Sequence, residues 1–225
     1  MIEPLLLSLR LAFASSAILL LAGVPLAYML ARRQFPLKRV LETIVLLPLT
    51  LPPTVLGYYL LVSLGYQGPL AQLFGIELAF RFEGLLLGSV IFSLPFALTA
   101  YREAFRALDE DLLQTARTLG ASRWRRWRHV ILPLTWPGLL AGTLLAFAHT
   151  LGEFGVVLMI GGSIPGETRV VSIYVYDLVQ ALDFEGAARV SGLLLVVSFV
   201  LLFAVRNLEA SWAGRYMSRT ESAHR

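Results

Sequence analysis

The chain has 225 residues, of which 57% are hydrophobic and only 15% are charged. A soluble domain usually has about 45–50% apolar and about 25% charged residues, so this composition excludes an ordinary soluble domain and a disordered chain. The lack of cysteine excludes disulfide scaffolds, thiolate metal sites and cysteine nucleophiles. The mean hydropathy of +0.71 favours a protein whose solvent is lipid.

Long apolar runs recur along the chain and predict five membrane-crossing helices. The expected spans are residues 4–30, 42–64, 84–101, 131–152 and 187–205. A helix needs about 20 apolar residues to cross about 30 Å of hydrocarbon, and the first four runs reach this length within a few residues. The fifth reaches it if Arg189 extends its charged end to the membrane surface. We therefore expect an all-α, multi-pass membrane bundle that forms a single domain, residues 1–225.

Basic residues gather on one side of these spans. The connectors 31–41 and 102–130 and the tail after residue 205 hold fifteen of the 19 lysines and arginines. Because basic residues are enriched in cytoplasmic loops, we expect the N-terminus outside the cell and the C-terminus inside. The isoelectric point of 9.7 is then a consequence of topology, and no nucleic-acid partner is expected.

The connector 102–130 predicts a short amphipathic helix that ends in a tight turn. Apolar residues recur there at helical spacing, at Leu108, Leu112, Leu113, Ala116 and Leu119. Asp109 is placed to cap the start of this helix, and Gly120 suits a C-terminal turn with positive φ. Such a helix either lies on the membrane surface, held to anionic lipid by arginines, or fits a partner's groove. The glycine at its end favours the second interpretation.

The spacing in this connector resembles the signature of permease subunits in binding-protein-dependent ABC importers. That signature is Glu-Ala-Ala, three residues, Gly, nine residues, Ile, one residue and Leu-Pro. The matching residues here are Gln114-Thr115-Ala116, Gly120, Val130 and Leu132-Pro133. The resemblance implies a coupling helix that sits in a cleft of a separate ATPase subunit. Its expected contact residues are Leu112, Leu113, Gln114, Thr115, Ala116, Leu119, Gly120 and Ala121.

Other segments resemble the oxyanion permeases of this superfamily, most closely those for molybdate. These segments are residues 26–38, 46–61 and 151–177. Sulfate and tungstate permeases share much of the pattern and stay as alternatives. The resemblance implies a bacterial inner-membrane subunit that pairs with a second copy to form the pathway. It also implies two ATPase subunits inside, an oxyanion-binding protein outside, and a surrounding lipid bilayer.

Hydrolysis of ATP is not expected from this chain itself, because its sequence contains no P-loop of the form GxxxxGK[ST]. We expect no catalytic residues, no cofactor and no metal site. An ion channel is the remaining alternative, with residues 161–163 as a filter. That interpretation would leave the helix within 102–130 unexplained.

Prolines in the second span predict a break in its helix. Pro48, Pro52 and Pro53 lack backbone N–H donors, while Thr50 and Thr54 carry hydroxyls that could satisfy the freed carbonyls. One interpretation is a pore-lining break that moves during transport. The other is a static kink packed against its neighbours.

Two ionisable residues mark the end of the fourth span. His149 and Glu153 are four residues apart and are expected on one helical face. We interpret them as a hydrogen-bonded helix–helix pair near the outer gate, with a direct gating or proton role as the alternative. Arg10 and Arg189 are candidate partners for Glu153 or for a passing anion. The segment 153–186 is expected to be extracytoplasmic or re-entrant, as a cap over the bundle or as a gate lining.

Overall fold

The computed structural model describes the backbone of residues 2–223 and the side chains of residues 2–208 and 210. The regular structure of the described residues is entirely helical. In chain order the helices are α1 (Ile2–Ile18), η1 (Leu19–Gly23), α2 (Val24–Arg32), α3 (Lys38–Leu46), η2 (Leu47–Leu49), α4 (Pro53–Leu64), α5 (Pro69–Phe74), α6 (Phe82–Arg106), α7 (Glu110–Thr118), α8 (Arg123–Arg126), η3 (Trp127–Ile131), α9 (Leu132–Gly152), α10 (Gly155–Gly161), α11 (Val171–Gln180) and α12 (Phe184–Ala223). The side chains of Arg215 and Arg219, and the whole of Arg225, lie outside the described part.

Among the residues that the structure describes, four continuous helical runs are long and apolar enough to cross a membrane. They are Ile2–Arg32, Phe82–Arg106, Arg123–Gly152 and Phe184–Leu208. These runs confirm the expected all-α membrane bundle. The first run passes from α1 through the π-helical turn η1 into α2 without interruption.

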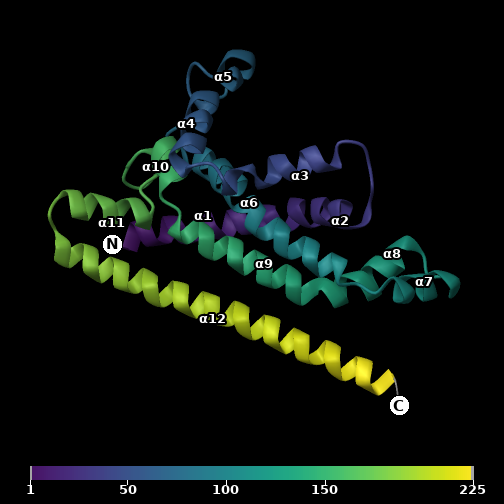
Figure 1. Cartoon of the computed structure of the whole chain (residues 1–225). Helices are drawn as coiled ribbons and strands as arrows, with labels where there is room; N and C mark the ends of the chain where they lie inside the picture. The colour runs from purple at the N-terminus through teal and green to yellow at the C-terminus, as the bar shows by residue number, and fades with distance from the viewer. Residues whose placement is uncertain (1, 224–225) are drawn as a thin grey trace.

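The remaining expected span, 42–64, differs from a single kinked helix. Lys38–Leu49 and Pro53–Phe74 together are long and apolar enough to cross a membrane, and they are bent by 109° at the break between them. Consequently α4 and α5 stand away from the long axis of the bundle (Figure 1). The sequence predicted the place of the break but not its size.

Helices α6 and α9 form the centre of the bundle, and small residues let them approach closely. A Cβ atom added at Gly142 would lie 2.8 Å from the ring of Tyr101, and one added at Gly138 would lie 2.6 Å from Cβ of Ala104. Small residues are common where membrane helices meet, because they allow close backbone packing. Tyr101 and Phe105 are fully buried in the core that results.

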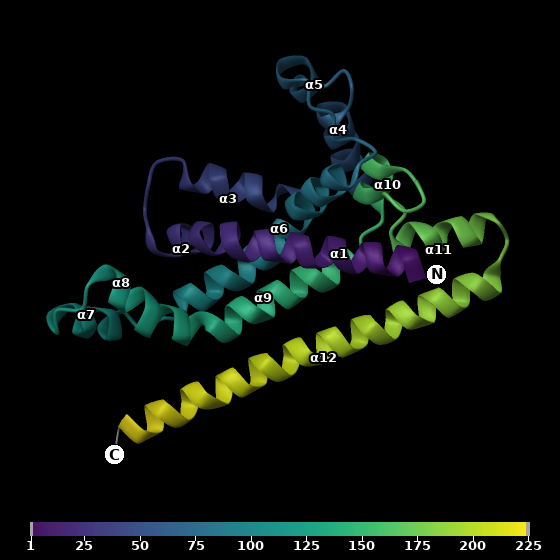
Figure 2. The ribbon, with the colours of Figure 1, turned by 180° about the vertical axis from the view of Figure 1, so that it is seen from behind.

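The two ends of the bundle carry different segments. Helices α7 and α8 lie at one end, beside the loop between α2 and α3, and α12 runs toward that end (Figure 2). The N-terminus, α10 and α11 lie at the opposite end (Figure 2). Within the expected segment 153–186, residues 171–180 form the helix α11 (Val171–Gln180), which lies beside the N-terminus (Figure 2).

Candidate translocation groove and coupling helix

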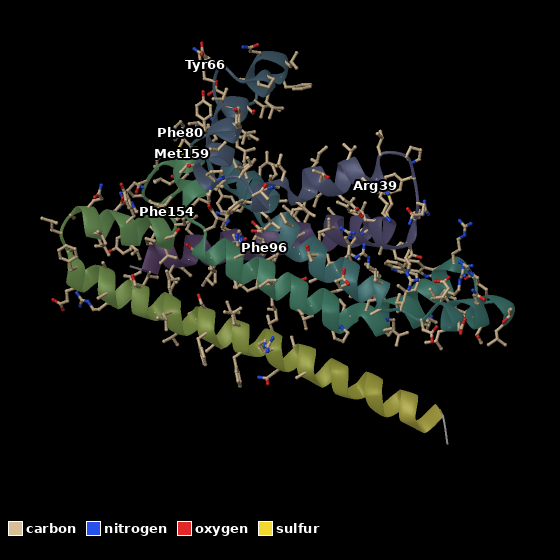
Figure 3. All side chains as sticks on the ribbon, in the orientation of Figure 1. Arg39, Tyr66, Phe80, Phe96, Phe154 and Met159 are labelled. Atoms are coloured by element: carbon tan, nitrogen blue, oxygen red, sulfur yellow. The ribbon has the colours of Figure 1, made fainter. Side chains whose placement is uncertain are left out.

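An open groove of about 620 Å³ lies beside the break in the second span, between α4, α6, α9 and α10. Four of the residues expected in the pathway line it: Pro53, Thr54, His149 and Glu153. Most of the other lining residues are apolar, and the labelled Phe154 and Met159 mark its α10 side in Figure 3. The fold therefore brings the two expected clusters, from the second and fourth spans, to one place.

The three other expected pathway residues belong to the break but not to the groove lining. Pro48 is buried in the 3-10 turn η2. Pro52 has φ −55° and ψ 134°, and α4 begins directly after it at Pro53. The Thr50 hydroxyl donates to the carbonyl of Leu47 at 3.0 Å, so it serves a backbone acceptor near the break as the sequence suggested.

Helix α4 packs tightly on α10 beside the break. A Cβ atom at Gly57 would lie 2.7 Å from Cβ of Met159, and one at Gly155 would lie 2.7 Å from Cβ of Pro53. Real Cβ atoms do not approach so closely, so only glycine fits at either position. No local pattern could indicate this pairing, because the two helices are about a hundred residues apart in the chain.

His149 makes the expected helix–helix hydrogen bond, but its partner is on α6. Its Nδ1 atom lies 3.0 Å from the Ser93 hydroxyl, which also lies 2.9 Å from the hydroxyl of Thr150. The imidazole stacks on Phe96, with ring centroids 4.0 Å apart. Aromatic packing and the serine thus hold the ring at the groove wall.

The expected pairing of His149 with Glu153 is wrong, because α9 ends at Gly152 and the backbone of Glu153 is extended. The carboxylate turns toward the next helix and accepts hydrogen bonds from the backbone N–H groups of Val156 at 2.7 Å and Val157 at 3.0 Å. Glu153 therefore caps the start of α10, where free N–H groups favour a negative charge. A carboxylate just before a glycine-rich apolar segment was the available signal for this role.

Neither arginine proposed as a partner reaches Glu153. The guanidinium of Arg10 lies 4.3 Å from the ring centroid of Phe82. Arg189 lies 3.9 Å from Glu185 on an exposed face of α12. The 5% exposed side chain of Glu153 is satisfied by backbone donors instead.

The short helix predicted in the connector 102–130 is α7, and both of its predicted ends are confirmed. Asp109 accepts a hydrogen bond from the backbone N–H of Asp111 at 2.8 Å. At the other end Gly120 has φ 75°. The N–H of Gly120 donates to the Arg117 carbonyl at 2.9 Å and that of Ala121 to the Ala116 carbonyl at 3.0 Å, the pattern of a Schellman cap.

Only part of the expected contact surface of α7 is free. Leu112 is 48% exposed and Leu119 is 81% exposed. Gln114, Thr115 and Gly120 are also exposed, while Ala116 and Ala121 are half-buried. Leu113 is buried in the chain's own core with Leu108, so its expected role as a partner contact does not fit. It anchors α7 to the bundle instead.

Two features at this end were missed by the sequence analysis. The basic run 123–128 is helical and forms the start of a continuous helix, Arg123–Gly152. The Ser122 hydroxyl caps this helix by accepting from the N–H of Arg125 at 3.3 Å. In addition, Arg32 at the end of α2 contacts Glu110 on α7 at 2.7 Å, which no local pattern could indicate.

Comparison with known proteins then decides the family. Residues 23–219 match the family described as binding-protein-dependent transport system inner membrane component. The chain belongs to this family. It is accordingly a permease, a transport component of an ABC importer rather than an enzyme, and a multi-pass inner-membrane protein.

Relatives that align along most of this chain are molybdenum and sulfate transport permeases. The permease is 44% identical to the molybdenum transport system permease protein ModB of Azotobacter vinelandii, over 92% of this chain and 94% of that protein. It is 40% identical to ModB of Escherichia coli K12, over 95% of this chain and 93% of that protein. A probable sulfate transport system permease protein of Marchantia polymorpha is 33% identical over 83% of this chain and 66% of that protein.

Solved structures support the fold of the permease. A chain of a bacterial alginate ABC transporter, in complex with an alginate-bound periplasmic protein, superposes with a TM-score of 0.73 at 19% identity. The match covers 92% of the permease and 77% of that chain. A chain of the MetNI methionine ABC transporter, in an inward-facing conformation, has a TM-score of 0.67 at 18% identity and covers 93% and 95%.

Proposed function

We propose that the chain is the permease subunit of an ATP-driven importer for molybdate. The observation that carries this proposal is the identity of 44% and 40% to two molybdenum permeases along more than nine-tenths of the chains. The 33% identity to a sulfate permease makes sulfate the second candidate. Tungstate is also a tetrahedral dianion, so any test of selectivity must include it.

The groove at the broken helix is assigned to the translocation pathway. Its polar side chains are few, chiefly Thr54, His149 and Glu153, and it includes no lysine or arginine. The carboxylate of Glu153 is already engaged by backbone N–H groups. Such a groove would hold a dianion weakly, which suits a pathway because a tight site would retain its cargo.

A second copy of the chain completes the pathway in this proposal. Helix α4 carries no charged residue, and Tyr58, Tyr59 and Val62 are each at least half exposed on it. Because α4 stands away from its own bundle, these side chains are placed to meet another copy near the groove. The chain has no native cysteine, so a Tyr59→Cys variant should form a disulfide-linked dimer in the membrane. Monomer alone under oxidising conditions would argue against this interface.

The end of the bundle with α7 is placed in the cytoplasm, where two ATPase subunits bind it. This orientation puts the arginine-rich connectors inside, as basic residues require, and leaves the end with α10 and α11 for an oxyanion-binding protein. Closure of the ATPases on ATP would move α7 and switch the bundles between outward- and inward-facing states. A Leu119→Cys variant should cross-link to a cysteine placed in the ATPase cleft.

The decisive experiment is uptake of labelled molybdate into vesicles that contain the complete transporter. We expect ATP-dependent uptake that unlabelled molybdate and tungstate suppress, and that sulfate at equal concentration suppresses far less. Equal suppression by sulfate would favour the second candidate. Uptake that continues without ATP would contradict an ATP-driven importer.

A further inference from the structure

A second groove, of about 650 Å³, lies at the α7 end of the bundle, between the ends of α2, α7 and α8. Its lining is rich in arginine: Arg32, Arg33, Arg117, Arg123 and Arg126. Glu110 is the one carboxylate among these lining residues, and it is occupied by Arg32 at 2.7 Å. The groove therefore has a large excess of positive charge.

The described part of the chain leaves most of the positive charge of this groove without an ion-pair partner. Within the described residues, Arg33, Arg117, Arg123 and Arg126 take part in no ion pair. Arg32 keeps a buried Nε–H group for which the described part of the chain provides no acceptor. The two other nitrogens of Arg32 are engaged by Glu110 and by the Leu108 carbonyl, so the unpaired charge of the groove belongs to the four other arginines.

The aromatic residues of the groove are of the kinds expected at the level of the membrane surface. Trp124 and Trp127 line it together with Tyr28, and the Tyr28 and Trp127 ring centroids are 5.0 Å apart. Trp124 is 69% exposed. Trp124 and Trp127 lie in the first turns of the continuous helix Arg123–Gly152, whose following turns are apolar enough to enter the bilayer. Tryptophan and tyrosine are enriched at this depth, where lipid headgroups lie.

We propose that this groove binds the headgroup of an anionic phospholipid, with its phosphate held by Arg33, Arg123 and Arg126. Guanidinium groups match phosphate oxygens with paired N–H donors, and basic pockets between helices at the membrane surface suit such headgroups. The apolar walls formed by Trp124 and Trp127 suit a lipid better than free phosphate. The proposed orientation of the chain places this groove at the cytoplasmic leaflet. Binding of the lipid itself does not depend on that orientation.

A lipid bound here would lie against both the end of the first long helix and the coupling helix. Arg33 follows α2 directly, whereas Arg117 and Leu113 reach the groove from α7. The lipid would thereby link these elements without contacting the exposed Leu112 and Leu119. Transport should then depend on anionic lipid even where the ATPase still binds.

The test compares lipid retention by purified complete transporter in native mass spectrometry, with phosphatidylglycerol as the probe. Replacing Arg33, Arg123 and Arg126 together with glutamine should lower retention at least about fivefold, the effect of even one arginine near an anionic surface. The matched control replaces Arg39, Arg125 and Arg128 with glutamine, which removes the same charge without touching the groove lining. Equal retention by the two triple variants would overturn the proposal.

Two further arms identify the occupant. Excess inorganic phosphate should not displace the lipid from the wild-type complex; displacement would mean that the groove takes free phosphate. An Arg126→Cys variant should be protected from an aqueous thiol reagent by phosphatidylglycerol. Protection by the ATPase alone, in vesicles of neutral lipid, would show a protein contact and overturn the proposal. Lipid retention is measured without transport, so its outcome does not depend on which oxyanion the permease carries.

Discussion

Arg32 and Glu110 are 78 residues apart in the chain, yet Nη1 of the arginine lies 2.7 Å from Oε2 of the glutamate. The second nitrogen, Nη2, donates to the backbone carbonyl of Leu108 at 2.7 Å. One side chain thus connects the end of the first long helix to the residues before and at the start of α7. A movement of α7 would be transmitted to that helix through this contact.

The first prediction is that Arg32→Gln weakens the coupling between ATP hydrolysis and transport. The loss of the hydrogen bond to the Leu108 carbonyl should cost about 1.5–3 kcal/mol, the range for hydrogen bonds with a charged partner. Glu110 is 54% exposed, so its ion pair adds less, about 0.2–1 kcal/mol. We expect ATP hydrolysis to persist in the assembled complex while uptake per ATP falls severalfold.

The matched control is Glu110→Gln, which keeps the bond from Arg32 to Leu108. It should reduce uptake per ATP only slightly. If both variants are equally impaired, the surface ion pair and not the carbonyl contact transmits the movement.

The second prediction concerns the Schellman cap of α7. Gly120 has φ 75°, and a Cβ atom there would meet nothing within 4 Å, so only backbone strain opposes substitution. Gly120→Val should destabilise the turn by roughly 1–2 kcal/mol, because a β-branched residue resists this conformation. The direction of α7 relative to its partner should then change. Uptake should fall while the membrane bundle stays folded. Gly120→Asn, which tolerates positive φ, should transport nearly normally, and impairment equal to that of valine would contradict the argument from strain.

The sequence predicted most of the fold because hydropathy and caps are local signals. Four runs of apolar residues became continuous membrane-spanning helices. The ends of α7 were predictable because Asp109 and Gly120 act on backbone groups within a few residues of themselves. The 109° bend was not predictable, since prolines indicate where a helix breaks while tertiary packing sets the angle.

The candidate groove was only half predictable for the same reason. Composition singled out His149 and Glu153, but the helical spacing that paired them assumed a helix continuing past Gly152. The real partners, Ser93 for the imidazole and the α10 backbone for the carboxylate, depend on how helices meet in space. The basic run from Arg123 was interpreted as a sign of membrane topology. The groove that it lines also needs residues of α2 and α7, which are distant in the chain.

The third prediction tests the contact between α4 and α10. In Gly57→Ala the new methyl group would lie 2.7 Å from Cβ of Met159 and 3.2 Å from Cα of Val156. Overpacking of this kind costs typically about 1–3 kcal/mol. We expect a lower thermal unfolding temperature and reduced uptake. Gly192→Ala is the control, because a Cβ atom there meets nothing within 4 Å. Equal stability of the two variants would contradict the tight packing.

The fourth prediction concerns Glu153, whose carboxylate accepts from two backbone N–H groups. Glu153→Ala leaves both donors without their partner, at about 1–3 kcal/mol for a buried group. Glu153→Gln keeps one acceptor oxygen and should lose less stability and less uptake. If Glu153 acts only as a helix cap, uptake should fall in step with thermal stability in both variants. A glutamine variant with wild-type stability and no uptake would instead favour a gating or proton role for the carboxyl group.

The last prediction concerns the break itself. Replacing Pro52 and Pro53 with alanine restores two backbone N–H donors and favours a helix that continues from η2 into α4, because proline is about 3 kcal/mol less favourable than alanine within a helix. The 109° bend should open, and α4 should withdraw from α10 and from the groove.

Spin labels on cysteines at the exposed positions Ile44 and Tyr58 should report a longer distance in this double variant. We expect it to assemble with its ATPase and to hydrolyse ATP, yet to transport poorly, because the groove loses its α4 wall. Pro69→Ala, at the first turn of α5 and away from the break, should leave both distance and uptake unchanged. A double variant with an opened bend and wild-type uptake would show that the break is only a packing feature and would remove residues 48–54 from the pathway.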